Sequence, residues 1–481
     1  MRFSVVIRYI GIILLVLSAF MLMSAGIAYV SSVDSSYYPL LMSSSLTLVL
    51  GCFPLIFVPR TDRISTKEGY CIVVGSWLVA SLVGMFPYLM WGGEFSIINA
   101  WFESVSGFTT TGASILNNIE ALPRGLQFWR MSTSWIGGVG VVMFALVILP
   151  SIGRSKRMLS SVELSSLAKD NFNYRTQTIV RIVLITYVLL TAVTTVALKL
   201  AGMCWFDALC HAMSACGTCG FGTKNTSIAF FNSGAIEFIL VLAMCMAGLH
   251  FGLIYATITG KSNNIFRSEV SRVYFTIIGV STVLIAISLW LADVYPTLWL
   301  SLRSGLFHTV SFLTTSGFAT VDCNTWSSFA ILILIFCSIV CGCAGSTSGG
   351  LKVDRFLVAA KMIRTRVRAQ RHPDAIFRTK IDGIAQSEDM MGAVMVFIVA
   401  YMMLILVGTF LNTLFGADLM TGFSAAVACT SNVGPGFGEV GTMYNYSLMP
   451  VVTKLNLTVL MLLGRLEIFG LIQLFFIRWW R

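Results

Sequence analysis

Charged side chains are scarce in this sequence. Only 11% of its 481 residues are Asp, Glu, Lys or Arg, while 57% are hydrophobic, and the mean hydropathy is +0.84. Soluble globular domains carry about 25% charged residues, so this composition excludes a water-soluble protein of this length. It predicts an all-α polytopic membrane protein whose helices cross the bilayer repeatedly.

A complete nucleotide-binding loop is also absent. Gly260, Lys261 and Ser262 resemble the end of one, but position 255 is a tyrosine where that motif requires glycine. ATP-driven transport by this chain alone is therefore not expected, and we predict that the chain itself binds no cofactor. Any effect of ATP would have to come through a partner.

A second C-x-x-C pair is absent as well. Cys216 and Cys219 form such a motif, with His211 upstream. One pair is too few for a zinc site with four cysteine ligands, and buried cysteines usually act as small hydrophobic residues. A membrane thiol oxidoreductase that uses Cys216 and Cys219 is a lesser alternative, because it leaves the repeated features of the sequence unexplained.

The positive charges are unevenly placed along the chain. The net charge is +11, and 25 of the 32 Lys and Arg residues fall at the two ends or in alternate connections between apolar segments. Cytoplasmic loops of membrane proteins are rich in Lys and Arg, so we expect these connections and both termini in the cytoplasm. The excess indicates topology rather than nucleic-acid binding, with anionic inner-leaflet lipids as secondary partners. The connections are residues 60–67, 154–181, 261–272 and 352–380.

Four short polar runs interrupt the apolar sequence, each built around one glycine. Small residues stand six positions before these glycines, inside short apolar stretches that read as half-length helices. Because the runs recur with their glycines 108, 97 and 117 residues apart, they predict four pseudo-repeated helix–pore loop–helix units around a central pore. The glycines are Gly112, Gly220, Gly317 and Gly434, and the small residues are Ser106, Ser214, Ser311 and Ala428.

Two apolar segments, residues 4–30 and 37–58, precede the repeats and contain no such run. We therefore expect two extra N-terminal transmembrane helices. With continuous spans such as residues 70–91 and 235–259, the pattern predicts ten spanning helices and four re-entrant ones. The expected divisions are the N-terminal helix pair (1–66), pore repeat 1 (67–152), a cytoplasmic linker with pore repeat 2 (153–262), pore repeat 3 with a gating loop and a basic cytoplasmic segment (263–386), and pore repeat 4 (387–481).

None of the four polar runs contains a carboxylate, which argues against a calcium-type ring of acidic side chains. A potassium ion sheds its water where backbone carbonyls replace it. Glycine allows successive carbonyls to point at one axis without steric cost. The residues predicted to form this K+ filter are Thr110, Thr111, Gly112, Thr218, Cys219, Gly220, Thr315, Ser316, Gly317, Asn432, Val433 and Gly434.

Five stretches of the sequence carry a family resemblance: TTTGAS at 109–114, TTSGFA at 314–319, NVGPGFG at 432–438, AGSTSGGLKV at 344–353 and LGRLE at 463–467. Together they resemble the TrkH, KtrB and HKT superfamily of potassium transporters, and the extra N-terminal helix pair is similar to that of its TrkH branch. The resemblance implies four units around one pore that carries K+, and a homodimer in the bacterial inner membrane. It also implies a separate cytosolic regulatory ring, similar to TrkA, that binds NAD or ATP.

Two features are predicted to gate the pore. Residues 341–350 interrupt the outgoing segment of the third unit with glycines and hydroxyl residues, which weaken a helix. In the resembled family the matching segment is an intramembrane gate; a kinked helix packed through small residues is the alternative. Arg465 lies within an apolar run, where a buried cation marks a pathway or a partner. It would either face the pore as a positive barrier or pair with an acid such as Glu103 or Asp207. The gate residues are Gly345, Ser346, Thr347, Ser348, Gly349, Gly350 and Arg465.

The predicted function is potassium uptake by a transporter that is not an enzyme. Glycine in all four loops favours potassium over sodium, since in the resembled superfamily a serine in place of the first glycine goes with sodium preference. A sodium-permeable protein, or a symporter coupled to H+ or Na+, stays open as an alternative.

Overall fold

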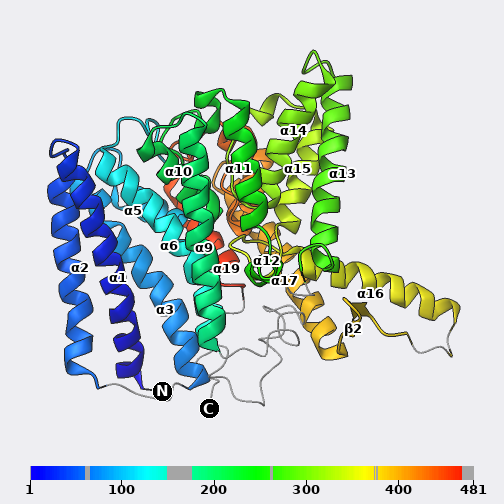
Figure 1. Cartoon of the computed structure of the whole chain (residues 1–481), viewed down its shortest axis with the longest axis horizontal. Coiled ribbons are helices and arrows are strands. Elements are labelled where there is room, and N and C mark those ends of the chain that lie inside the picture. Colours follow the sequence, from blue (N-terminus) through cyan, green and yellow to red (C-terminus); the bar gives the residue numbers. More distant parts are fainter. Residues whose placement is uncertain are drawn as a thin grey trace.

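The computed structural model describes residues 2–59, 65–148, 176–260, 264–372, 374 and 377–468. Nearly all regular structure in these residues is helical, and the chain is a helical membrane protein (Figure 1). Most of the predicted basic connections at 60–67 and 154–181 lies outside the described residues, as does the last predicted helix beyond residue 468.

The two N-terminal helices pack against each other at one edge of the bundle (Figure 1). They are α1 (Phe3–Val30) and α2 (Tyr37–Phe57). A Cβ built on Gly11 would lie 2.8 Å from the carbonyl oxygen of Gly51, so the two backbones touch there. Ser18 and Ser44 each donate a hydrogen bond to the other's carbonyl at 2.9 Å. Small residues and hydroxyl bonds of this kind hold helices together in lipid, where burial of apolar surface gives no driving force.

Four units follow, and each begins with a long incoming helix and ends with an outgoing one. The incoming helices are α3 (Thr66–Gly84), which continues as α4 (Phe86–Trp91), then α9 (Thr176–Leu200), α13 (Glu269–Leu291) and α17 (Glu388–Leu414). The outgoing helices are α6 (Arg124–Ile148), α11 (Gly234–Ala247) with α12 (Phe251–Ile258), α15 (Ser328–Val340) with α16 (Val353–Arg371), and α19 (Val451–Arg465).

Between these helices each unit has a short helix that is followed by one of the glycine runs. At about 1.5 Å per residue, helices of 12 to 16 residues are too short to cross a hydrocarbon core of about 30 Å. They are the predicted re-entrant half-helices. They are α5 (Ile97–Phe108), α10 (Trp205–Gly217), α14 (Leu298–Leu313) and α18 (Leu419–Ser431).

Small elements complete the described structure. Single 3-10 turns follow three of the glycine runs: η3 (Ser227–Phe231), η4 (Cys323–Thr325) and η5 (Gly438–Val440). Strands β1 (Lys380–Ile381) and β2 (Ile384–Ala385) form an antiparallel hairpin. Its turn residues Asp382 and Gly383 both have positive φ, 47° and 82°, as a two-residue turn of this type requires.

Several predicted spans are broken rather than continuous. Of the described helices, six are long and apolar enough to cross a membrane, or seven if α11 and α12, bent by 105°, count as one span. The predicted span at 70–91 is present as one candidate span, Lys67–Trp91, although a turn at Met85, just before Pro87, separates α3 from α4. The prediction at 235–259 is wrong because α11 ends at Ala247 and α12 restarts at Phe251. The bend between α11 and α12 and the break between α15 and α16 account for part of the difference from the ten spans expected.

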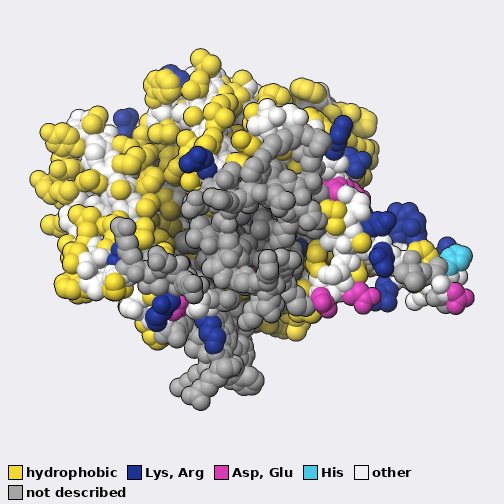
Figure 2. All heavy atoms as spheres, turned by 60° about the horizontal axis from the view of Figure 1, so that its bottom comes forward, with side chains coloured by type: hydrophobic (Ala, Val, Ile, Leu, Met, Phe, Trp, Pro, Cys, Tyr) yellow, Lys and Arg dark blue, Asp and Glu magenta, His cyan; other side chains and the backbone are white. Residues whose placement is uncertain are grey.

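The surface of the described residues agrees with a membrane setting. Large hydrophobic side chains are exposed on the outer faces of the helices; on α2, for example, Phe53 is 61% exposed and Ile56 74%. In water such surfaces would be a liability. By contrast, α16 projects from the end of the bundle and carries Lys and Arg side chains (Figures 1 and 2). This helix is most of the predicted basic segment 352–380.

Candidate functional site

All four half-helices begin in the same way. In each, the residue before the helix accepts a hydrogen bond on its side chain from the backbone N–H three residues later, at 3.3 Å. Each half-helix then ends at its glycine run, so the carbonyl end of the helix dipole, which favours cations, faces the run. The capping residues are Ser96, Cys204, Thr297 and Asp418.

All four half-helices also end in the same way. The residue two before each glycine lies in the left-handed region, with φ of 52°, 54°, 57° and 58°. The next N–H donates back to the carbonyl five residues earlier, at 2.8 to 3.0 Å. This is the bond that closes a helix C-terminus in a Schellman motif, and it explains the six-residue spacing of small residues and glycines in the sequence. The left-handed residues are Thr110, Thr218, Thr315 and Asn432, and the donors are Thr111, Cys219, Ser316 and Val433.

The four loops meet in a closed ring. Each glycine has positive φ, between 68° and 97°, and a Cβ on it would overlap the carbonyl oxygen of the residue before the glycine in the next loop. The overlaps run from Gly112 to Cys219, from Gly220 to Ser316, from Gly317 to Val433, and from Gly434 back to Thr111. We call these eight residues the glycine ring. The structure therefore brings together the four predicted loops around one axis.

Side chains beside the ring are buried, and several of them form hydrogen bonds with one another or with neighbouring loops. The Thr111 hydroxyl lies 2.8 Å from that of Thr109, and the Ser316 hydroxyl lies 2.8 Å from that of Thr314. Asn432 donates from Nδ2 to Thr111 Oγ1 at 2.9 Å and to the carbonyl of Met461 at 3.0 Å. These hydroxyl and amide donors hold the loops, while Thr110 Oγ1 and Asn432 Oδ1 are buried without a hydrogen-bond partner among the described residues. The contacts between neighbouring loops in the ring are made by backbone carbonyls.

The two cysteines of the C-x-x-C pair are both fully buried and form no disulfide. His211 contacts the carbonyl of Asp207 through Nδ1 and packs against the rings of Phe231 and Phe318. In the described part of the chain, no group of three or more His, Cys, Asp or Glu residues is placed to hold a metal ion. The geometry thus gives no support to a thiol or metal chemistry at this loop.

The predicted interruption of the third outgoing helix is present, between α15 and α16. It docks against the second unit and against the loop of its own unit. Thr347 donates through Oγ1 to the carbonyl of Cys216 at 3.0 Å, at the end of α10. Gly349 donates its N–H to Thr315 Oγ1 at 3.1 Å. The predicted gate residues therefore lie directly against the half-helix ends of the second and third units.

Within this segment the other predicted gate residues hold its shape. Ser346 donates to the carbonyl of Cys343 at 2.6 Å, and its hydroxyl lies 2.7 Å from that of Ser348. Gly345 and Gly350 have positive φ, 76° and 70°. A Cβ on Gly345 would overlap the ring of His250, at the break between α11 and α12. The two helix breaks thus pack against each other.

Arg465 reaches across the bundle, and its guanidinium binds carbonyl groups. It is 4% exposed, and it donates to the carbonyl of Thr347 at 2.8 Å and to that of Gly137 at 3.4 Å. The alternative that it pairs with Glu103 or Asp207 is wrong. Glu103 forms an ion pair with Arg130, and Asp207 accepts a hydrogen bond from Thr223. Arg465 therefore links its own unit to the gate segment of the third unit and to the first.

The sequence analysis missed one relation that the structure makes plain. A Cβ on Gly464 would overlap the carbonyl oxygen of Thr430, and a Cβ on Gly137 would overlap that of Phe108. Thr430 and Phe108 each stand four residues before a ring glycine. The residues that follow Gly464 and Gly137, namely Arg465 and Gly138, are therefore equivalent. In the other three loops, the residue three positions before the ring glycine contacts a glycine of an outgoing segment. Gly217 contacts Gly138, Thr314 contacts Gly248, and Ser431 contacts Gly349. Arg465 thus stands where the other three outgoing segments have glycine, which an alignment of the four units could have revealed.

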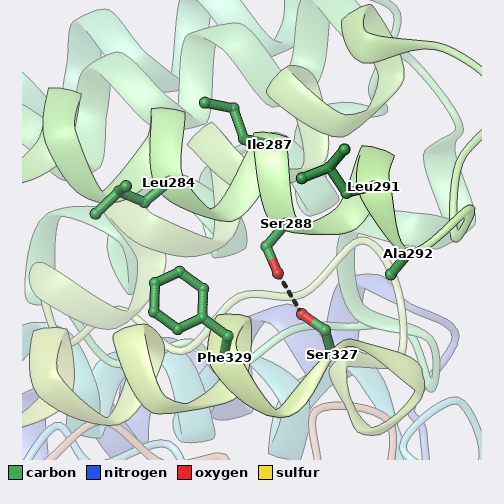
Figure 3. Close-up of a pocket in the computed structure, with 7 residues that line it drawn as sticks. All are labelled: Leu284, Ile287, Ser288, Leu291, Ala292, Ser327 and Phe329. Carbon is green, nitrogen blue, oxygen red and sulfur yellow. Dashed lines mark hydrogen bonds between the residues drawn. The ribbon is translucent and has the colours of Figure 1, made fainter.

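A separate apolar pocket lies between α13 and α15 (Figure 3). The hydroxyls of Ser288 and Ser327 lie 2.6 Å apart in it, among Leu284, Ile287 and Phe329. None of its lining residues belongs to a glycine run or to the gate segment, so the pocket is not part of the candidate site.

Comparison with known proteins agrees with this geometry. Residues 54–479 match the family model TrkH, described as a cation transport protein. The chain is 32% identical over 486 residues to the Trk system potassium uptake protein TrkH of Escherichia coli (strain K12), with both chains covered completely. It is 31% identical over 424 residues to TrkG of the same strain, covering 87% of this chain and 86% of TrkG. The crystal structure of the potassium transporter TrkH from Vibrio parahaemolyticus superposes with a TM-score of 0.90 at 30% identity, again over both complete chains. The chain therefore belongs to the TrkH family of cation transport proteins.

Proposed function

We propose that this chain is a potassium uptake transporter that conducts K+ through the glycine ring. The observation that carries the proposal is the closed set of contacts from each ring glycine to the carbonyl of the next loop. Relatives over the full length are named as potassium uptake proteins and not as enzymes, and the chain is accordingly a transporter rather than an enzyme.

In this proposal the filter consists of the twelve residues predicted from the sequence, three in each loop. Backbone carbonyls replace the water around a K+ ion, and no charged side chain is needed to hold it. The carbonyl ends of four half-helices face the loops and add a favourable potential for a cation. Full burial of Thr111, Cys219, Ser316 and Val433 supports a ring of fixed size, because the surrounding residues resist its contraction around a smaller ion.

We propose that the gate consists of the segment 345–350 and Arg465. The guanidinium is fixed by the carbonyl of Thr347, so a movement of the segment would release it. A positive charge on the ion path repels cations, and its displacement would open the path. The hydrogen bond from Gly349 to Thr315 would pass that movement to the filter.

The membrane location, the oligomeric state and the partners are part of the same proposal. We place the chain in the bacterial inner membrane with both termini in the cytoplasm, as a homodimer whose pore units follow the predicted divisions. A separate cytosolic ring, similar to TrkA and binding NAD or ATP, would act on the gate. The exposed arginines of α16, Arg364, Arg366, Arg368 and Arg371, fit anionic lipid headgroups at the cytoplasmic surface. We expect no nucleic-acid partner.

The experiment that tests the function is rubidium-86 uptake into liposomes that contain only the purified chain. Unlabelled K+, Na+ and Li+ serve as competitors. Uptake that K+ blocks and Na+ blocks weakly supports a potassium-selective pathway. Equal competition by Na+ favours the sodium-permeable alternative, and uptake that follows an imposed proton or sodium gradient favours a symporter. If folded protein takes up no rubidium, even with its cytosolic regulator added, the proposal fails.

A further inference from the structure

Two charged side chains face each other behind the loops of the first two units. Arg130 Nε lies 2.5 Å from Glu103 Oε1, and the two side chains are 1% and 0% exposed. Glu103 belongs to the half-helix α5 and Arg130 to the outgoing helix α6. Neither residue belongs to the twelve filter residues or to the gate.

The carboxylate of Glu103 holds the part of loop 1 that follows the ring glycine. It accepts hydrogen bonds from Ser114 Oγ at 3.0 Å and from the Ile115 N–H at 3.1 Å. Other units have a neutral side chain in this role, at the third N–H after the glycine. His308 accepts from the Thr320 N–H at 3.4 Å. Ser424 accepts from the Phe437 N–H at 2.8 Å, so among these three units the first alone uses a charge.

The guanidinium of Arg130 holds the corresponding part of loop 2. Its Nη1 donates to the carbonyl of Gly222 at 3.1 Å, and its central carbon lies 3.6 Å from the centre of the Phe221 ring. Phe221 and Gly222 directly follow the ring glycine Gly220. The ion pair therefore joins loop 1 to loop 2 immediately beyond the glycine ring.

Stability alone is a weak reason for such a pair. Removing two charges from water costs about as much as their attraction returns, and apolar replacements of buried pairs are often neutral. We propose that the Glu103–Arg130 pair sets the cation affinity and the potassium selectivity of the glycine ring. It does so by fixing the two loops relative to each other and by cancelling two charges beside the ion path. This inference rests on the proposed function of the ring.

The sign of the effect separates an electrostatic role from a merely structural one. Glu103→Gln leaves a positive charge beside the ring and is expected to raise the K+ concentration for half-maximal binding at least roughly fivefold. Arg130→Gln leaves a negative charge and is expected to lower that concentration by a similar factor. The double variant Glu103→Gln/Arg130→Gln removes both charges, so its K+ affinity returns toward the original while its preference for K+ over Na+ falls.

The measurement is the Tm of the purified full chain as a function of K+ or Na+ concentration, which reports cation binding whether or not the gate is open. Glu237→Gln is the matched control, since it breaks the Arg303–Glu237 pair (2.7 Å) between α11 and α14. We expect it to leave cation binding unchanged. Single variants that both weaken K+ binding, or that both leave it unchanged, overturn the inference.

The double variant and one further variant, Gly112→Ser, keep the outcome decisive. If the single variants do not fold, the double variant carries the test, and an unchanged K+/Na+ preference in it overturns the inference. Gly112→Ser, measured in parallel, tests the ring itself. If Gly112→Ser changes the preference and the pair variants do not, only the role of the pair is wrong. If none of them changes it, the ring is not the filter.

Discussion

The glycine ring and the layer beside it, formed by Arg465 and the segment 341–352, are built on opposite plans. In the ring all four units repeat the same helix C-cap hydrogen bond, a left-handed residue at the same position and the same glycine contact. In the adjoining layer three units have a glycine where the fourth has Arg465, and one outgoing helix is interrupted by a docked segment. A site that surrounds a spherical ion is best served by equivalent groups. A site that opens and closes needs one element that differs from the rest.

The largest expected effect comes from breaking the repeat in the ring. Gly112→Ser introduces a Cβ that overlaps the carbonyl oxygen of Cys219, at a φ of 81°. The carbonyl must shift, so we expect sodium permeation to rise relative to potassium by roughly tenfold, which corresponds to about 1.4 kcal/mol. Rubidium-86 uptake with Na+ as competitor measures this ratio.

Gly92→Ser is the control for that substitution. Gly92 has a similar φ of 84°, but a Cβ on it would meet nothing within 4 Å. It also places a side chain at a positive φ but without the overlap, and it should leave ion preference unchanged. Equal shifts in both variants would show that strain, and not the ring, causes the change.

The next largest effect is expected from replacing Arg465, the residue that makes the fourth unit differ from the other three in the adjoining layer. Arg465→Ala removes the positive charge and the hydrogen bond to Thr347, so flux should rise by roughly tenfold without a change in ion preference. Arg465→Lys keeps the charge but loses the two-carbonyl geometry, and should give an intermediate flux. Unchanged flux in Arg465→Ala, with normal expression and folding, would contradict a barrier role.

A smaller effect is expected at the hydrogen bond that joins the gate segment to the third loop. Thr315→Val removes the hydroxyl that accepts the Gly349 N–H, which should cost about 1 kcal/mol and raise basal flux a few-fold by loosening the segment. Thr218→Val is the matched change in the second loop, where the hydroxyl bonds only to the adjacent carbonyl of Gly217 in the described structure. Flux and thermal unfolding of both variants, measured together, should differ; identical behaviour would rule out a link through Thr315.

The smallest effect is expected from making the fourth loop match the others. Asn432→Thr gives that loop the residue found in the other three, but loses the bonds to Thr111 Oγ1 and the Met461 carbonyl. We expect a loss of about 1 to 2 kcal/mol in stability, seen as a lower Tm, and a K+/Na+ ratio within about twofold of the original. A large selectivity change would mean that the amide itself contacts the ion.

The ring could be predicted from the sequence because its determinants are local. A glycine, a small residue six positions earlier and a short apolar stretch specify each loop without reference to the rest of the chain. The break at 248–250 could not be predicted in this way, because it is held by contacts from a distant unit: Gly248 accepts from the Cys343 N–H at 2.9 Å, and Phe251 donates to Gly345 at 3.3 Å.

The two buried arginines also combine a feature that is visible in the sequence with partners that depend on the fold. Arg465 was recognisable as an arginine in an apolar run, but its carbonyl partners depend on how units far apart in the sequence meet. Arg130 carried the same signal, an arginine at the start of an apolar helix, and the rule that such residues are functional would have identified it. Its pairing with Glu103 required the fold, since 27 positions separate the two residues.

The closed ring has one more consequence, which concerns how such a protein can change over generations. In an assembly of four identical chains a single mutation alters every quadrant at once. Here one chain supplies all four loops, so a mutation alters one quadrant and leaves three intact. The positions before the ring glycines already differ, with threonine, cysteine, serine and valine in turn. Ion preference can therefore change one loop at a time. After duplication of an ancestral unit, one unit could specialise in controlling the pore while the other units continued to bind the ion.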